Sequence, residues 1–130
     1  MRVGVIGVGH LGYHHARILR SLASEVTVFD VREARTAEVA SELGIAAASS
    51  ASELLSRVDA VVVASDTVTH HDVVMQALAA GCHTLVEKPI ASDSIQAAHL
   101  ASEAERLGLV LAVGHVERFN PAVVAAGALI

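Results

Sequence analysis

The sequence predicts a single α/β domain with a doubly wound parallel sheet. Apolar runs short enough for strands alternate with segments of helical periodicity from one end of the 130-residue chain to the other. Several of these runs have no polar residue in alternation, which is typical of strands buried on both faces of a parallel sheet. Strands and helices that alternate with tight connections predict right-handed crossovers within one sheet. A chain of this length supports one sizeable core and not two.

The strands and helix ends follow from local patterns. Glycines stand where helix C-caps are expected, at Gly44, Gly81 and Gly108, each before a predicted strand. Residues 50–53 and 69–72 have the capping-box spacing, in which an oxygen and a carboxylate three residues apart satisfy free N–H groups at a helix start. The predicted strands are residues 3–6, 26–29, 45–47, 60–64, 84–86 and 110–113.

Composition and charge exclude several classes of function. Hydrophobic residues make up 53% of the chain, yet no uninterrupted apolar run reaches the ~18 residues of a membrane span. The net charge of −5 argues against nucleic acid or an anionic membrane as a partner, and aromatic residues are too few for base stacking. Any bound phosphate must therefore be held by backbone groups and helix ends.

The single cysteine and the start of the chain bear on the compartment. Cys82 permits no internal disulfide and is expected to pack in the core, since it follows a glycine C-cap and leads into a strand. The first residues enter a strand pattern and not a signal sequence. We therefore expect a cytoplasmic protein.

A glycine motif between the first strand and the first helix predicts a dinucleotide site of the Rossmann type. Gly7 allows the sharp turn, Gly9 leaves room for a pyrophosphate, and Gly12 lets the helix pack closely against the strand. The free N–H groups and the positive dipole end of the helix can bind a diphosphate without a lysine. The alternative is a glycine turn that only joins strand to helix.

Asp30 favours NAD over NADP. It lies eighteen residues after Gly12 at the end of the second predicted strand, where a carboxylate accepts hydrogen bonds from the ribose and repels a 2′-phosphate. Arg32 could neutralise part of that repulsion, so NADP stays the less favoured alternative. Asp30 could also be the N-cap of a helix over residues 31–43, and the two roles do not exclude each other.

Lys88 is the best catalytic candidate. It follows a strand at the carboxyl edge of the sheet, where doubly wound folds bind their ligands, and Pro89 restricts it to extended backbone. An ammonium group beside an oxidised nicotinamide could exchange a proton with a substrate hydroxyl. The alternative is a solvated lysine at a strand end.

Three segments, residues 3–12, 87–89 and 114–121, together resemble the Gfo/Idh/MocA oxidoreductase family. The resemblance implies an NAD(P)-dependent dehydrogenase that oxidises a secondary alcohol of a sugar, cyclitol or nucleotide sugar by hydride transfer to nicotinamide. It implies that Lys88 is the catalytic lysine, Glu87 its companion on the cofactor side, and Arg118 a residue near the nicotinamide. Residues 114–121 are most similar to those of bacterial members acting on nucleotide sugars.

Residues 64–70 are similar to the family loop that lies against the cofactor and ends in a histidine. Asp66 departs from the proline often found there, and His70 is expected to be neutral and to face the nicotinamide. The candidate cofactor-binding residues are therefore Gly7, Gly9, His10, Leu11, Gly12, Asp30, Val31, Arg32, Ala64, Ser65, Asp66, His70, Glu87, Lys88 and Arg118. No metal site is expected, because no Cys or carboxylate completes a ligand set around the eight histidines.

The family implies a division of the protein beyond this chain. We expect residues 1–121 to be the dinucleotide-binding domain and residues 122–130 to begin a linker helix to a substrate domain absent from the sequence. The resemblance further implies a small sugar-like substrate and a homo-oligomer for the intact protein, and no activity for this chain alone. The alternative is a non-catalytic NAD-binding or redox-sensing module.

Overall fold

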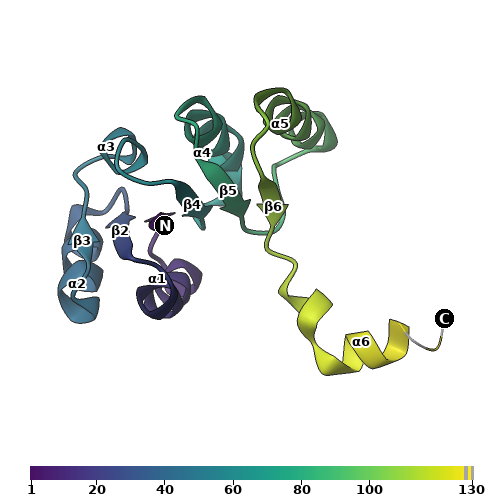
Figure 1. The fold of residues 1–130 in the computed structure, drawn as a ribbon, viewed down its shortest axis with the longest axis horizontal. Helices are drawn as coiled ribbons and strands as arrows, with labels where there is room; N and C mark the ends of the chain where they lie inside the picture. The colour runs from purple at the N-terminus through teal and green to yellow at the C-terminus, as the bar shows by residue number, and fades with distance from the viewer. Residues whose placement is uncertain (128, 130) are drawn as a thin grey trace.

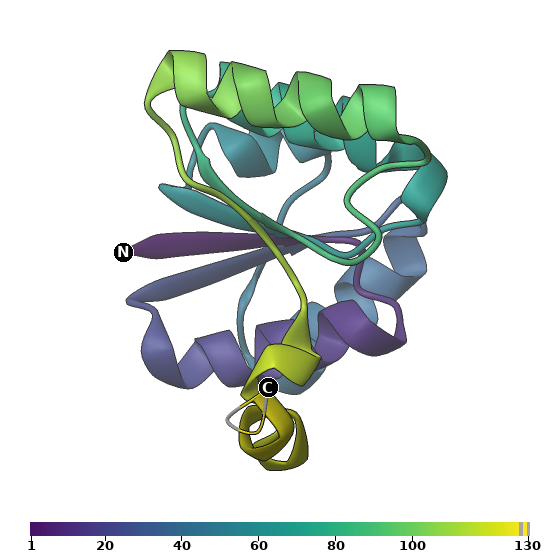
Figure 2. The same cartoon turned by 90° about the vertical axis from the view of Figure 1, so that its right-hand side faces the viewer.

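The computed structural model describes residues 1–127 and 129, and it confirms the doubly wound α/β fold. Six parallel strands form one sheet in the order β3-β2-β1-β4-β5-β6, covered by helices on both faces (Figures 1 and 2). The strands are β1 (Arg2–Ile6), β2 (Glu25–Phe29), β3 (Ala46–Ala47), β4 (Ala60–Val63), β5 (His83–Val86) and β6 (Leu111–Val113). The helices are α1 (His10–Leu22), α2 (Glu33–Leu43), α3 (Ala51–Leu55), α4 (Thr67–Ala79), α5 (Ser94–Leu107), the 3-10 turn η1 (Val116–Phe119) and α6 (Pro121–Gly127).

Two hydrophobic clusters hold the layers together, one on each face of the sheet. Val5 of β1 packs toward α1 and α2 with Val39, whereas its neighbour Ile6 packs toward α3, α4 and α5 with Leu78. This alternation follows from the two-residue period of a strand, and it explains why β1 reads as a continuous apolar run. In Figure 1, α1 and α2 lie below the sheet and α3, α4 and α5 lie above it.

The position of the site follows from the strand order. β1 pairs with β2 on one side and with β4 on the other, so the chain connections diverge between β1 and β4. Beyond the carboxyl ends of two such strands, no connection crosses the sheet and a crevice remains. The loops after β1, β2 and β4 border this crevice.

Helix ends agree with the glycine pattern. Gly44 and Gly108 are the left-handed C-caps of α2 and α5, with φ of 62° and 67°. Gly81, with φ of 80°, stands one residue after the C-cap of α4. The capping box at residues 50–53 is also present, since the Glu53 N–H donates to Ser50 Oγ at 3.1 Å, although the Glu53 carboxylate accepts from Ser49 N at 2.6 Å.

The capping box expected at residues 69–72 is wrong. Helix α4 begins at Thr67 with Asp66 as its N-cap, so Thr69 lies inside the first turn, and its hydroxyl donates to the Asp66 carbonyl at 2.7 Å. The Asp66 backbone is extended, with φ of −67° and ψ of 140°, and the helix already includes Thr67 to Thr69 before it reaches the buried His70.

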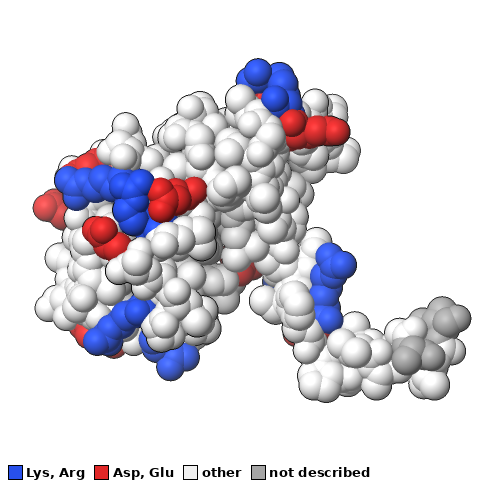
Figure 3. All heavy atoms as spheres, viewed as in Figure 1, with Lys and Arg blue, Asp and Glu red and all other residues white. Residues whose placement is uncertain are grey.

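The segment after β6 leaves the layers of the sheet. η1 and α6 extend away from the body, and α6 has no acidic or basic side chain along its surface (Figures 1 and 3). Val123 and Val124 are 48% and 59% exposed. Residues 128 and 130 of the expected linker lie outside the described residues, and within the described part no helix is both long and apolar enough to cross a membrane.

Candidate cofactor-binding site

A cavity of about 580 Å³ opens at the carboxyl ends of β1, β2 and β4. It brings together eight of the candidate residues: Gly7, Gly9, Asp30, Val31, Arg32, Ala64, Ser65 and Asp66. The sequence analysis did not single out the other lining residues, which are Ile6, Phe29, Ala51, Thr69, Val73 and Gln76. The cavity lies at the switch point, where an α/β sheet binds its ligands.

The three glycines of the first loop are needed for different structural reasons. Gly7 has φ of +85°, and a Cβ there would stand 2.6 Å from the Ser65 nitrogen. A Cβ on Gly12 would collide with the Gly7 carbonyl oxygen, so the first turn of α1 packs directly on the end of β1. At Gly9 no heavy atom lies within 4 Å of such a Cβ, so this side of the loop is open. The opening faces the N-terminus of α1, whose first turn contains no acidic residue and can accept an anion.

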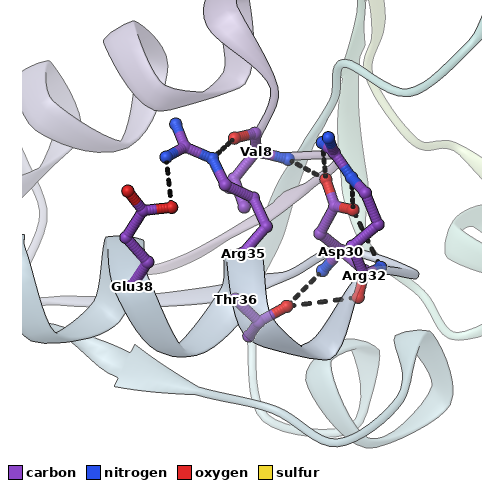
Figure 4. A network of polar contacts seen from close by, with 6 residues as sticks. All are labelled: Val8, Asp30, Arg32, Arg35, Thr36 and Glu38. Carbon is purple, nitrogen blue, oxygen red and sulfur yellow. Dashed lines mark hydrogen bonds and ion pairs between the residues drawn. The ribbon is translucent and has the colours of Figure 1, made fainter.

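Asp30 and α2 hold this loop in shape (Figure 4). Asp30 is 7% exposed, and its Oδ2 accepts the Val8 N–H at 3.0 Å. Its Oδ1 accepts the backbone N–H and the Nε–H of Arg32, each at 3.0 Å. The Val8 carbonyl accepts from Arg35 Nε at 2.9 Å, so both backbone groups of Val8 are bound by residues after β2. Thr36 Oγ1 accepts the Asp30 N–H at 2.8 Å and donates to the Asp30 carbonyl at 3.1 Å.

Two of these residues were missed in the sequence. Thr36 had a signal, because it has helical spacing with the buried Val39, Ala40 and Leu43. A polar residue on such a face must find a partner. Arg35 had no such signal in the sequence, because its contact with Val8 depends on how α2 packs beside the loop.

The N-cap role considered for Asp30 is wrong. Helix α2 begins at Glu33, two residues later than the expected start, and its N-cap is Arg32. The Asp30 carboxylate instead binds the loop and the Arg32 side chain. Burial raises the pKa of Asp30, but the hydrogen bonds from Arg32 and Val8 outweigh it, so the pKa lies below its usual value.

The lowered pKa of Asp30 predicts a pH-dependent contribution to stability. Because the folded-state pKa lies below the unfolded value of about 3.9, this stabilisation is complete above pH ~5 and is lost as the pH falls through the folded-state pKa. Asp30→Asn is uncharged at every pH. We expect it to unfold about 1–3 kcal/mol more easily than the wild type at pH 7, and urea titrations should show this difference shrinking below pH 4. A difference that stays constant from pH 7 to pH 3 would contradict the assignment.

Lys88 and Arg118 both line a second, smaller cavity. It measures about 240 Å³ and lies between the end of β5 and the turn after β6, with Gly114, His115 and Val123 in its walls. Lys88 is exposed, and its peptide bond to Pro89 is cis, which the sequence analysis did not predict. The two candidates therefore share one surface, next to the crevice but outside the cavity of the glycine loop.

The remaining candidates lie around these cavities. His70 is 1% exposed, and its Nδ1 and Nε2 lie 2.9 Å and 3.0 Å from the carbonyl oxygens of Pro89 and Ser65. The buried ring therefore bridges the loop after β4 and the segment after β5. His10 and Leu11 are exposed on the first turn of α1. Glu87 is buried beneath Lys88, within 2.8 Å of His15.

The structure also describes the single cysteine and the side chains that could bind a metal ion. Cys82 is buried, as expected, with Sγ 3.5 Å from the Leu55 and Val58 carbonyl oxygens, and burial raises the pKa of its thiol. In residues 1–127 and 129, no group of three or more His, Cys, Asp or Glu side chains is placed to hold a metal ion.

Known proteins have a similar sequence and a similar architecture. Residues 1–115 match the Gfo/Idh/MocA family model, described as an oxidoreductase family with an NAD-binding Rossmann fold. The UDP-N-acetylglucosamine 3-dehydrogenase of Acidithiobacillus ferrooxidans is 46% identical over 123 residues, which cover 95% of this chain and 39% of that protein. The scyllo-inositol 2-dehydrogenase (NAD(+)) of Bacillus subtilis is 34% identical and covers 94% of this chain and 37% of its own length.

Solved structures agree with the sequence matches. A structure of the Acidithiobacillus ferrooxidans enzyme superposes with a TM-score of 0.94 at 43% identity, covering 99% of this chain and 43% of that one. The chain spans about two fifths of the length of the curated relatives named above. These relatives are dehydrogenases of a nucleotide sugar and of a cyclitol. The chain belongs to the Gfo/Idh/MocA oxidoreductase family, of which it comprises the NAD-binding Rossmann domain.

Proposed function

We propose that this domain binds NAD in a dehydrogenase that oxidises a secondary alcohol of a nucleotide sugar. The observation that carries the proposal is that an open glycine loop and a buried carboxylate line the same cavity. Gly9 leaves space over the N-terminus of α1 for a diphosphate, and Asp30 stands where a ribose would lie. The 46% identity to a UDP-N-acetylglucosamine 3-dehydrogenase supports the substrate class.

The cavity residues fit a nicotinamide dinucleotide by their donor set. The first turn of α1 offers backbone N–H groups and a positive dipole end to the diphosphate. Ribose hydroxyls would compete with Arg32 for the Asp30 carboxylate, and the Arg32 side chain is 64% exposed and free to move toward solvent. A carboxylate at this position disfavours a 2′-phosphate, which supports NAD as the cofactor.

We assign proton transfer in this reaction to Lys88. A bound nicotinamide would supply the hydride acceptor. The Lys88 backbone N–H donates to Glu87 Oε2 at 3.2 Å, while its exposed side chain extends from the cavity wall that it shares with Arg118. In its neutral amine form, the Lys88 side chain can accept the hydroxyl proton of an alcohol as hydride departs, and it becomes an ammonium group. With its substrate domain expected elsewhere in the protein, we expect this chain to bind NAD without turnover.

Asp30→Ala tests the cofactor assignment. Loss of hydrogen bonds to a carboxylate costs about 1.5–3 kcal/mol, so we expect NAD affinity to fall about tenfold to a hundredfold. NADP affinity should change less, since the variant frees Arg32 for a 2′-phosphate. Calorimetric titration of the wild type and the variant with both cofactors measures the NAD to NADP affinity ratio.

The ratio separates cofactor selection from loss of fold, because unfolding would weaken both cofactors alike. Asp72→Ala, which removes an exposed carboxylate on α4, is the matched control and should leave the ratio unchanged. A wild-type chain that binds neither cofactor would rule out the proposed function. Binding without turnover in the whole protein would favour the redox-sensing alternative.

A further inference from the structure

Glu87 is a buried carboxylate to which the proposed proton transfer gives no role. The residue is 4% exposed at the end of β5. A carboxylate in such a position costs free energy unless hydrogen-bond donors surround it. Two donors lie within reach, namely Nε2 of His15, 2.8 Å from Oε1, and the backbone N–H of Lys88, 3.2 Å from Oε2.

A third segment closes over the same carboxylate. A Cβ on Gly114, which follows β6, would stand 2.8 Å from Glu87 Oε1, so the backbone at residue 114 lies directly against the carboxylate. Helix α1, the end of β5 and the turn after β6 therefore converge on Glu87. Its side chain has no room to turn toward Gly114 and is held between two donors.

The hydrogen-bond directions give His15 a defined part. The Lys88 N–H is a donor, so Oε2 accepts from it. When the carboxylate carries no proton it has only acceptors, and the 2.8 Å contact is then a hydrogen bond that Nε2 of His15 donates to Oε1. The His15 ring thus fixes the orientation of the carboxylate, and the carboxylate in turn fixes the backbone of Lys88.

We propose that His15 is a positioning residue for Lys88. It lies on α1, the helix whose first turn faces the cofactor cavity, and it acts across 72 residues of sequence on the strand end that carries the lysine. One imidazole ring therefore connects the diphosphate-binding helix to the proton-transfer group. The inference rests on the proposed role of Lys88 beside the nicotinamide.

Two substitutions of His15 by residues with the same amide group but different lengths test whether its hydrogen bond to Glu87 positions Lys88. His15→Gln places an amide N–H close to the position of Nε2, whereas His15→Asn is one methylene shorter and does not reach Glu87. Lys88 is the only lysine in the sequence, so lysine labelled with ¹³C gives NMR signals from this residue alone. Each protein is titrated with NAD and with ADP-ribose, which lacks the nicotinamide.

The expected results differ between the two amides. In the wild type and in His15→Gln, the Lys88 signal should shift on addition of NAD and stay in place on addition of ADP-ribose. In His15→Asn, the NAD-induced shift should diminish, while the affinities for NAD and for ADP-ribose should both stay within about threefold of the wild type. His14→Asn, one residue earlier on α1, is the control and should behave as the wild type.

Two results would overturn the proposal. A loss of more than about threefold in the affinity of His15→Asn for both NAD and ADP-ribose would mean that the substitution only loosens α1. A His15→Gln protein that behaves like His15→Asn would mean that the hydrogen bond to Glu87 is not what matters. Failure of the wild type to bind NAD would instead contradict the proposed function, so the two failures are distinguishable.

Discussion

Replacing Gly12 with alanine is expected to destabilise the domain by about 3 kcal/mol or more. The new Cβ would collide with the Gly7 carbonyl oxygen and lie 2.9 Å from the Gly7 carbonyl carbon. Both are backbone atoms at the end of a central strand, so neither can turn aside as a side chain would. Overpacking costs about 1–3 kcal/mol even where side chains can adjust, a large part of the roughly 5–15 kcal/mol that stabilises a domain. Urea unfolding measures the loss directly.

The same chemical change at Gly9 should have a different result. No heavy atom lies within 4 Å of a Cβ there, and φ is −62°, which alanine adopts readily. We expect Gly9→Ala to unfold within about 1 kcal/mol of the wild type, since only its N-cap preference is lost. NAD binding should be lost nonetheless, because the methyl group occupies the space left for the diphosphate.

The pair separates a structural glycine from a binding glycine. If Gly9→Ala bound NAD as tightly as the wild type, the diphosphate would not lie over the first turn of α1. If Gly12→Ala retained full stability, the close contact between α1 and β1 would be absent in solution. Gly44→Ala is a poor control for either variant, because Gly44 has φ of +62° and strain would accompany the substitution.

The sheet was predictable because its strands are buried on both faces. The buried positions of such strands are nearly all apolar, with Thr27 of β2 as an exception, so β1, β2 and β4 stand out from the sequence to within a residue or two. Helix ends at glycine were predictable for a similar reason, since few other residues adopt a positive φ. The start of α4 was not, because Asp66 and Thr69 are both residue types that cap helices, and the spacing at residues 69–72 favoured Thr69 whereas the N-cap is Asp66.

The cavity was predictable only where backbone geometry or charge fixes the residue type. Gly7 is required by the positive φ of the loop, Gly9 by the space proposed for the diphosphate, and Asp30 by the ribose proposed to lie beyond the end of β2. Arg35 and His15 could not be placed from the sequence, because each acts on a partner brought close by tertiary packing. His15 lies 72 residues from Glu87, and no local pattern connects them.

Replacing Lys88 with alanine in the whole protein is expected to lower kcat about 10²–10⁴-fold, the range typical of a lost general acid or base. The Lys88 side chain is exposed, and the residue is anchored through its backbone N–H to Glu87, so the substitution should leave the fold intact. NAD affinity should stay within about threefold of the wild type, because the residues proposed to bind diphosphate and ribose are unchanged.

Lys88→Arg decides between charge and proton transfer as the role of this residue. A guanidinium group keeps the positive charge beside the nicotinamide but is protonated at every accessible pH, so it cannot accept the hydroxyl proton. If proton transfer is the function, Lys88→Arg should be as slow as Lys88→Ala, as measured by steady-state oxidation of a UDP-sugar. Recovery of kcat in Lys88→Arg would assign the lysine to electrostatic stabilisation instead. Arg106→Ala, which removes a surface charge on α5, controls for the change in net charge and should retain full turnover, because Arg106 pairs only with Glu103 among the described ion pairs.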